Sequence, residues 1–558
     1  MKILREIPPK FPPTKFVAID TEWLGLDSER LHRPFGKFAC MTVSTGNDEV
    51  YLLEDVNSVR KALNNLSDCV WVFHDAKFDV QHLRSIADVP KRSRLWDTYL
   101  IDRLLWNNYY DLFALKHLAR RYLGILVDKT VREDFATAVA LTDTMRTYAC
   151  YDADITAKIA QCQRKDFTST DMNLWKIDRD AMWAMCDFMG FRIDKDRWLN
   201  VARKNLQKAS DIKKQLSFNP HSSTEVVKAL RRLGIASISN SKKETLEKLL
   251  DTVSDAHILQ MLQLVVDARK YAKYASTYGE DFLNKYVETI DGVDVIIADY
   301  NVTGAITGRT SCSAPNMQNI PIKDTNIFRE CFIARPGNKL IIADYSAQEP
   351  AILAVLAKDE KLIDVFQSGS DVYIEIARLV FGKTITKSDP LRQVIKSVFL
   401  GLNYGMSASG LAKKLQITSD EAQNILNKFY KTFPDVHSWQ AKQRRLKSYA
   451  ISMLGRKVWL NPYSNQVSQW VLNAPIQSTA AEMMKKALAT IHKEWNFDYP
   501  FACVGYIHDE VVFDVPEHLA DTAAKFIKTT MEEVSLQITG AIRIKADTKM
   551  GNSWADKK

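Results

Sequence analysis

The alternation of hydrophobic and polar positions divides the chain into segments of different period. Up to about residue 165, short β-rich runs are interleaved with longer stretches of helical period. The β-rich runs cover 15–19, 41–44, 50–53 and 70–73, and the helical stretches cover 76–87, 97–106, 112–122 and 144–165. This pattern predicts a sheet with helices packed on it.

Beyond residue 165 the pattern changes twice. It is mostly helical from about 166 to 295 and again over 350–450. A buried strand is expected at 339–343, and two strands about a tight polar turn are expected over 502–515, followed by one more helix and a terminal strand. We therefore expect a multidomain protein in which an α/β region is followed by an α+β region.

The composition excludes several classes of protein. The 558 residues are enough for about three or four domains, and 46% of them are apolar, so the chain can bury sizeable cores. No apolar run approaches the roughly 18 residues of a membrane helix, and prolines interrupt the region where a signal peptide would be apolar. The eight cysteines form no CxxC pair, which disfavours a zinc ribbon or a disulfide scaffold. We expect a cytoplasmic protein.

The charge of the chain points weakly to a polyanionic partner. The formal net charge is +9, and residues 197–250 carry twelve Lys and Arg against four Asp and Glu. This stretch is either a solvated helical face or a surface that follows a phosphate backbone. A nucleic-acid enzyme also needs clusters of carboxylates, because these hold Mg²⁺.

Acidic residues of the first region form one candidate metal site. Asp20 and Glu22 lie at i and i+2 at the end of a predicted strand, so their side chains share a face. Asp79 follows another strand at the start of a helix, and Tyr148 and Asp152 lie one helical turn apart. Four acids from three elements can enclose two metal ions that promote phosphoryl displacement by water, which the Tyr148 hydroxyl would orient.

A second candidate site joins residues that are far apart in the sequence. Asp344 ends the buried strand, while Asp509 and Glu510 lie on the later polar turn, so pairing of the two elements would bring the acids together. Between them, a helix expected over 389–405 carries a stripe that is cationic in its N-terminal half and apolar or aromatic in its C-terminal half. The stripe suits a triphosphate at one end and a nucleobase at the other, and it consists of Arg392, Lys396, Leu400 and Tyr404.

Both groups of segments resemble known families. The first resembles the three motifs of proofreading 3′→5′ exonucleases of the ribonuclease H-like fold, with Tyr in the third motif, over roughly 10–165. The second resembles motifs A, B and C of the DNA polymerase I family (family A) over about 296–558, with further matches at 307–309, 315–321 and 473–481. The resemblance implies a ribonuclease H-like exonuclease domain (1–165) and a right-hand polymerase domain (166–558). Its parts would be a thumb (about 166–300), a palm (about 301–355 and 465–558) and fingers (about 356–464).

The resemblance also implies roles for individual residues, with two Mg²⁺ in each site and Mn²⁺ able to substitute. The polymerase metal ligands would be Asp344, Asp509 and the Tyr345 carbonyl, with Glu510 beside them. The exonuclease residues would be Asp20, Glu22, Asp79, Asp152 and Tyr148. The dNTP would contact Arg392, Lys396, Leu400, Tyr404, Gln348, Glu349 and Tyr373, with Lys396 protonating the pyrophosphate and Glu349 and Tyr404 closing the space beside the sugar. Primer and template would contact Arg309, Gln318, Asn319, Asn473, Gln477 and His508.

Four positions depart from the family pattern. Asp75 stands where the second exonuclease motif usually has Asn, and its extra charge either weakens binding of the displaced strand or lies in solvent. Tyr373 replaces the usual His of the fingers, Ala351 the Arg after the motif A Glu, and Leu400 the usual aromatic residue. None of the last three departures removes a metal ligand, so these three bear on nucleotide selectivity. Because leucine has no hydroxyl, Leu400 predicts discrimination against dideoxynucleotides; the alternative is that it only packs the core of the fingers.

Two other functions compete with a proofreading DNA polymerase. A stand-alone exonuclease with a C-terminal nucleic-acid-binding region would leave Asp344 and Asp509 without a purpose. A non-enzymatic processivity or scaffold protein would have lost catalytic acids, and here all of them are present. Because no segment precedes the exonuclease, we expect a bacteriophage replicative polymerase in the host cytoplasm. Its partners would be primer–template DNA, dNTPs, single-stranded 3′ ends and unidentified replisome proteins such as a helicase, a single-strand binding protein or a processivity factor.

Overall fold

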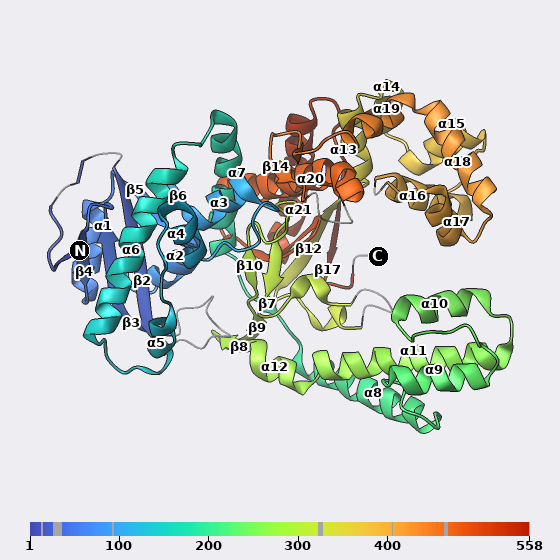
Figure 1. Cartoon of the computed structure of the whole chain (residues 1–558), viewed down its shortest axis with the longest axis horizontal. Coiled ribbons are helices and arrows are strands. Elements are labelled where there is room, and N and C mark those ends of the chain that lie inside the picture. The colour runs from blue at the N-terminus through green and yellow to red at the C-terminus, as the bar shows by residue number, and fades with distance from the viewer. Residues whose placement is uncertain are drawn as a thin grey trace.

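The computed structural model describes residues 1–9, 11–12, 15–25, 36–91, 94–321, 327–403, 405–461 and 467–556, apart from the side chains of Leu400, Asn403 and Ser468. Figure 1 shows four groups of elements: an N-terminal sheet with its helices, a central sheet, and two helical groups that project from the central sheet on the same side of the molecule. The multidomain α/β and α+β organisation expected from the sequence is thus confirmed.

The N-terminal group is built on a six-stranded sheet in the order β1-β4-β3-β2-β5-β6. β2 is antiparallel to β3 and parallel to β5, and the long helix α6 packs across β2, β3 and β4. The strands are β1 (Lys2–Leu4), β2 (Phe16–Leu24), β3 (Lys37–Ser44), β4 (Glu49–Leu53), β5 (Val70–Phe73) and β6 (Leu95–Asp97). The helices are α1 (Val56–Asn65), α2 (Ala76–Leu83), α3 (Thr98–Trp106), α4 (Leu115–Leu123), η1 (Thr130–Glu133), α5 (Asp134–Thr137) and α6 (Asp143–Gln163).

Some boundaries in this group differ from the expectation. β2 runs on to Leu24, so Asp20 and Glu22 lie inside the strand and not at its end. α2 ends at Leu83, four residues before the predicted end, because a turn follows it, and α4 begins only at Leu115. The alternation of half-buried and buried residues along β2 nevertheless places the two acids on one face, as predicted.

The segment from 166 to about 300 is mostly helical, as expected. Its two longest helices, α8 (Lys195–Lys214) and α11 (Ala256–Thr277), pack along each other and enclose a small core of their own with α9 (Ser223–Arg232) and α10 (Lys243–Thr252). In Figure 1 this arm lies below the central sheet. The remaining elements are α7 (Ser169–Cys186), α12 (Glu280–Tyr286), β7 (Phe191–Arg192), β8 (Val287–Ile290) and β9 (Val293–Ile296).

A four-stranded antiparallel sheet in the order β15-β16-β12-β17 forms the centre of the molecule. Its strands are β15 (Cys503–Ile507), β16 (Glu510–Pro516), β12 (Asn338–Tyr345) and β17 (Ala546–Gly551). β12 is apolar and fully buried over its middle four residues, which explains its place between two other strands. The helix α21 (Glu517–Thr539) packs on β12, β16 and β17, and α20 (Val467–Glu494) packs on α21 and α7.

The other helical group lies between the two halves of the central sheet in the sequence. It consists of α13 (Gln348–Ala357), α14 (Glu360–Gln367), α15 (Val372–Phe381), α16 (Pro390–Asn403), α17 (Ala408–Leu415), α18 (Ser419–Thr432) and α19 (Pro434–Gln443). Short pieces complete the chain: β10 (Asp299–Asn301), β11 (Ser311–Ser313), η2 (Met317–Asn319), η3 (Arg329–Cys331), β13 (Tyr449–Ile451) and β14 (Lys457–Trp459). α16 begins at Pro390 with Asp389 capping it, since the Asp389 carboxylate accepts the Leu391 N–H at 2.8 Å.

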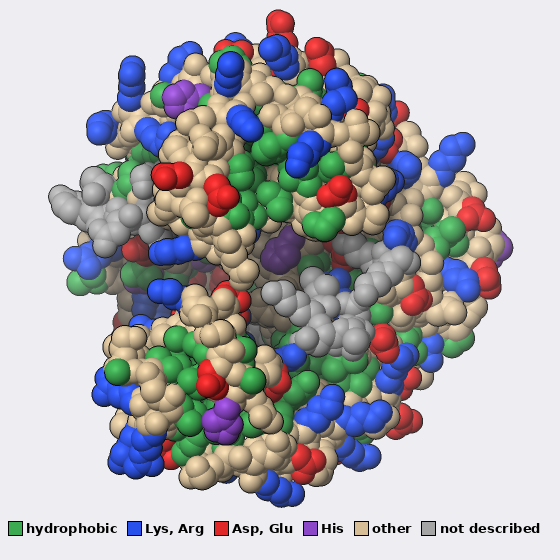
Figure 2. Space-filling view, turned by 90° about the vertical axis from the view of Figure 1, so that its right-hand side faces the viewer, with side chains coloured by type: hydrophobic (Ala, Val, Ile, Leu, Met, Phe, Trp, Pro, Cys, Tyr) green, Lys and Arg blue, Asp and Glu red, His purple; other side chains and the backbone are tan. Residues whose placement is uncertain are grey.

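Figure 2 shows that the face on the side of the two helical groups is hollowed between an upper and a lower mass, with Lys and Arg side chains along both. Among the described residues, no helix combines the length and the apolar character needed to cross a bilayer. All eight cysteines are free, which agrees with the absence of a disulfide scaffold expected from their spacing.

Candidate active sites

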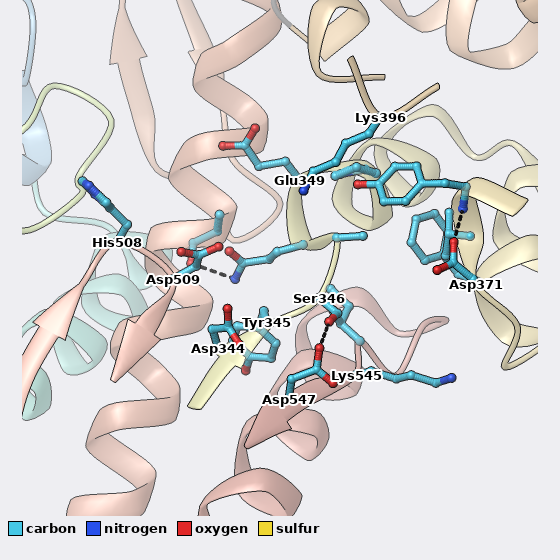
Figure 3. A pocket seen from close by; sticks show the side chains of 18 of the residues that line it. Asp344, Tyr345, Ser346, Glu349, Asp371, Lys396, His508, Asp509, Lys545 and Asp547 are labelled. Atoms are coloured by element: carbon cyan, nitrogen blue, oxygen red, sulfur yellow. Dashed lines mark hydrogen bonds between the residues drawn. The ribbon is translucent and has the colours of Figure 1, made fainter. Parts of the chain in front are cut away.

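The central sheet brings together the acids that the sequence places far apart. β12 and β16 pair so that Asp344 lies directly opposite Glu510, and the Tyr345 N–H donates to the Asp509 carbonyl at 3.4 Å. His508 takes a left-handed backbone with φ of +56°, which allows the tight turn between β15 and β16. Figure 3 shows the Asp344 and Asp509 side chains close to each other at one end of a cavity.

This cavity has a volume of about 770 Å³ and opens between the central sheet and α13, α15 and α16. A polar wall with carboxylates at one end and cations at the other suits a ligand that carries phosphates and metal ions. Ten of the residues singled out in the sequence line it: Asp344, Tyr345, Gln348, Glu349, Tyr373, Arg392, Lys396, Arg309, His508 and Asp509. Sequence reasoning missed other lining residues that carry charge, namely Asp371, Lys387, Arg543, Lys545 and Asp547.

Charged side chains within the cavity are paired with one another. The Arg309 guanidinium donates to the Glu349 carboxylate at 2.6 Å, which joins an expected primer-contacting residue to the expected sugar gate. Arg392 is held by Asp371, whereas Lys396, one turn further along α16, is exposed and points into the cavity. The carboxylates of Asp344 and Asp509 at one end of the cavity and the cations of α16 at the other therefore belong to different elements of the fold.

Glu510 has neighbours that the sequence did not indicate. Its backbone lies opposite Asp344, but its side chain is buried and absent from the residues that line the cavity. The carboxylate accepts a hydrogen bond from the Trp554 indole at 2.7 Å and forms an ion pair with Arg329 at 3.4 Å. A buried carboxylate needs such partners, and here they tie the β15–β16 hairpin to the C-terminal segment.

The remaining predicted contact residues either lie around the cavity or are not among the residues that the structure describes. Gln348 is buried and its amide lies 3.4 Å from the Ala480 carbonyl. Tyr345 is buried as well and donates its hydroxyl to the Met531 carbonyl, so only its own carbonyl remains as a candidate ligand. Four predicted primer or template contacts do not line the cavity: Gln318, Asn319, Asn473 and Gln477. Tyr404 and the Leu400 side chain lie outside the described residues.

The exonuclease acids gather beside β2, an inner strand of the N-terminal sheet. Asp20 and Glu22 project from one face of β2, and Asp79 is buried at the start of α2. The Asp79 carboxylate accepts both the backbone N–H of Thr21 at 3.0 Å and its hydroxyl at 2.7 Å, which fixes α2 against β2. Asp152 reaches the same region from α6.

The charges of these carboxylates favour binding of a cation. Burial and the nearby charge of Asp152 raise the pKa of Asp20 to about 7, and burial with the charge of Asp20 raises the pKa values of Glu22 and Asp79 well above their usual range. One carboxylate oxygen of Asp20 and one of Asp152 are buried without a hydrogen-bond partner. Unpartnered oxygens among mutually repelling carboxylates fit divalent metal ions, whose ligands of choice are carboxylates.

Lys129, which the sequence did not indicate, contacts two residues of this group. The Lys129 ammonium donates to the Tyr148 hydroxyl at 2.9 Å and forms an ion pair with Asp152. No motif marks Lys129, because it lies in a loop before η1, so only the fold brings it near. Within the described residues, no three Asp, Glu, His or Cys side chains are close enough to enclose a metal ion as they stand, so metal binding would have to draw these carboxylates together.

Asp75 lies at the start of α2 with φ of +72°. Asn and Asp tolerate this left-handed backbone better than other residues with side chains. The Asp75 side chain is exposed by its surface area, yet its crowded surroundings and the nearby charge of Asp97 raise its pKa to about 7. The effect of its extra charge on binding of the displaced strand stays a prediction.

Comparison with known proteins matches each of the two parts of the chain to a family. The profile of DNA polymerase family A matches residues 196–556, and that of a 3′-5′ exonuclease matches residues 4–166. Proteins of these families generally depend on divalent metal ions. The DNA polymerase of Mycobacterium phage D29 is 27% identical over 591 residues, which cover 96% of this chain and 93% of that protein.

Other relatives are bacterial. The thermostable DNA polymerase I of Thermus aquaticus is 31% identical over 359 residues, covering 61% of this chain and 42% of that protein, and the chain spans about half the length of several such relatives. Among solved structures, the POL domain of Pol1 from M. smegmatis in complex with DNA primer-template and dNTP has a similar fold, with a TM-score of 0.80 at 21% identity over 97% of this chain and 95% of that one. The chain belongs to DNA polymerase family A, with a 3′-5′ exonuclease domain in its N-terminal part.

Proposed function

We propose that this protein is a DNA-directed DNA polymerase that extends a primer 3′-OH with dNTPs and removes mispaired 3′ ends with a separate 3′-5′ exonuclease. The observation that carries the proposal is the cavity on the central sheet, whose wall holds Asp344 and Asp509 on the sheet and Arg392 and Lys396 on α16. Carboxylates at one end and cations at the other are the arrangement that metal-assisted transfer of a nucleotide from a triphosphate needs.

In the polymerase site, Asp344, Asp509 and the Tyr345 carbonyl would hold two Mg²⁺ ions. When bound, these ions activate the primer oxygen and stabilise the charge of the transferring phosphate. Arg392 and Lys396 bind the triphosphate, and the Lys396 ammonium gives its proton to the departing pyrophosphate. Glu349 closes the space beside the sugar to a ribose 2′-OH in this proposal, while Arg309 and His508 contact the primer end.

In the exonuclease site, Asp20, Glu22, Asp79 and Asp152 would hold the two Mg²⁺ ions that promote hydrolysis of the terminal nucleotide. The Tyr148 hydroxyl orients the attacking water. The unpartnered oxygens of Asp20 and Asp152 support this assignment because they are left for ligands from outside the chain.

The larger parts of the molecule have roles that follow from their position. We assign the thumb to about 166–300, the palm to about 301–355 and 465–558, and the fingers to about 356–464. The basic stretch at 197–250, which includes most of α8 and all of α9, would grip the duplex backbone. Replication of a phage genome, location in the host cytoplasm and replisome partners stay predictions from the sequence.

Extension of a mismatched primer tests both activities together. The protein is incubated with Mg²⁺, dNTPs and a 5′-labelled primer whose last base is mispaired. We expect removal of the mispaired nucleotide followed by full extension. Shortening without any extension would favour the stand-alone exonuclease, and no change in primer length would contradict both assignments.

A further inference from the structure

The guanidinium of Arg392 is held from one side by a carboxylate of another helix. Arg392 Nη2 donates to Asp371 Oδ2 at 2.8 Å, and Arg392 Nε lies 3.1 Å from the same oxygen and 3.3 Å from Oδ1. Arg392 belongs to the first turn of α16, whereas Asp371 immediately precedes α15. This side-on pair engages two of the three guanidinium nitrogens, and Nη1 makes no hydrogen bond with any described residue.

Asp371 is itself fixed in place. It is the N-cap of α15, and its Oδ1 accepts the backbone N–H groups of Tyr373 at 3.1 Å and Ile374 at 3.3 Å. Partial burial raises the pKa of Asp371, but the hydrogen bonds and charge of Arg392 and the N–H donors outweigh burial and hold that pKa below its usual value. The carboxylate is therefore ionised at neutral pH and its position is set by the end of a helix.

The ring of Tyr373 supports the same guanidinium from a second direction. The central carbon of the Arg392 guanidinium lies 5.3 Å from the centre of the Tyr373 ring, within the range of a cation–π contact. Tyr373 is buried and lines the cavity together with Asp371 and Arg392. Figure 3 shows Asp371 at the far end of the cavity from Asp344 and Asp509, with Lys396 between.

We propose that Asp371 is a positioning residue for the nucleotide triphosphate, which fixes Arg392 side-on so that its free nitrogen, Nη1, faces the phosphates. The inference rests on the proposed function, because it needs a triphosphate in this cavity. An arginine that is already oriented loses less conformational freedom on binding an anion than one that is free. Lys396 has no comparable support among the described residues, so the two cations differ in how strongly the protein orients them.

Substitution of Asp371 by neutral residues that still cap a helix tests this role. Asp371→Asn and Asp371→Ser keep an N-cap for α15 and remove the charge that holds Arg392. We measure incorporation of a single dNTP by the full chain and expect KM for the dNTP to rise about tenfold, with kcat changed less than about threefold, because charge-assisted hydrogen bonds are roughly twice as strong as neutral ones. Degradation of single-stranded DNA by the same preparations should be unchanged, which shows that the variants are folded.

A double-substitution cycle separates positioning from a general structural effect. Once Arg392→Ala has removed the guanidinium, adding Asp371→Asn should leave KM where Arg392→Ala put it, within about twofold. The matched control is Asp255→Asn, since Asp255 caps α11 through the same two N–H positions, those of His257 and Ile258, and no described arginine pairs with it. This control should leave KM and kcat unchanged.

The outcomes are distinct. An unchanged or lowered KM in Asp371→Asn, with extension intact, would overturn the inference and leave the proposed function standing, and a lowered KM would mean that Asp371 competes with the triphosphate for Arg392. Additive effects of Asp371→Asn and Arg392→Ala would also overturn it. Failure of the unsubstituted protein to extend any primer would instead overturn the proposed function, and this inference with it.

Discussion

Single side chains in this protein meet their partners across large sequence distances, and the partner changes what each residue can do. Glu349 is an example: its carboxylate accepts a hydrogen bond from Arg309 at 2.6 Å, forty residues earlier in the chain. The pair keeps the carboxylate at the wall of the cavity, beside the place where the sugar of a nucleotide is expected. The selectivity assigned to Glu349 thus depends on Arg309 as well.

Replacement of Glu349 by alanine tests the sugar gate. We expect Glu349→Ala to incorporate ribonucleotides more readily relative to dNTPs, by about tenfold or more, because the space that the carboxylate fills becomes open to a 2′-OH. The measurement is the ratio of kcat/KM for a ribonucleotide to that for the matching dNTP. Glu375→Ala, which removes a half-buried carboxylate paired with Arg378, is the control and should keep the ratio of the unsubstituted protein. A ratio that stays unchanged in Glu349→Ala would show that this residue is not the gate.

At the scale of helices and strands, the sequence predicted those with strong periodicity and missed the short ones. The strand at Val70–Phe73 and the hairpin around His508 and Asp509 lie where they were predicted. β1 and β6 were missed because three residues are too few to show alternation, and they are recognisable only by their pairing with β4 and β5. α1 was missed although Asp55 caps it through the Ser58 N–H.

The same reason explains which parts of the sites were predictable. Carboxylates on a strand or turn follow motifs, so Asp20, Glu22 and Asp509 could be selected from the sequence. Lys129 and Asp371 could not, because each acts on a residue of another element and no local pattern records that contact. Charge pairs between elements are thus the part of the site that only the fold shows.

Asp187 connects three helices, and its contacts predict how the free energy of unfolding depends on pH. It follows α7, pairs with Arg84 of the segment after α2 at 2.6 Å, and accepts a hydrogen bond from His492 of α20 at 2.6 Å. Partial burial raises the pKa of Asp187, but these partners outweigh burial and lower that pKa to about 2. Because the folded state binds this proton less readily than the unfolded state, the stabilisation is present above about pH 4 and is lost as the pH falls toward 2.

We therefore expect Asp187→Asn to lower the free energy of unfolding by about 2 kcal/mol at pH 7. The difference from the unsubstituted protein should shrink as the pH falls from 4 to 2, where the native carboxyl becomes protonated. Denaturant unfolding at a series of pH values measures this, with Asp180→Asn, at an exposed position of the same helix, as the control. A difference that stays constant from pH 7 to pH 2 would contradict the role assigned to Asp187.

At the scale of the whole molecule, two candidate catalytic sites lie on two separate sheets. The parts that carry them are joined by polar and aromatic contacts: Lys77 of α2 pairs with Asp299 of β10, and the rings of Trp106 and Trp459 stack with centres 5.5 Å apart. These contacts hold the parts together without sharing any metal ligand between the sites. A substitution in one site should therefore leave the chemistry of the other unaffected.

The exonuclease side of this separation is tested with Asp20→Ala combined with Glu22→Ala. Loss of both carboxylates removes ligands from both metal positions, so degradation of single-stranded DNA should fall by several orders of magnitude. Extension of a matched primer should remain within about threefold of the unsubstituted protein, since α20 and the central sheet are untouched. Loss of both activities in a folded double variant would count against two independent sites.

The most direct test of the account is the fate of a labelled, matched primer incubated with the Asp509→Asn variant, Mg²⁺ and dNTPs. Asparagine keeps the shape of the turn and removes the charge that a metal ion requires, so the account predicts that extension falls by several orders of magnitude. The same sample should shorten single-stranded DNA at the rate of the unsubstituted protein. Near-normal extension with the exonuclease intact would contradict the assignment of Asp509, and with it the placement of the polymerase site on the central sheet.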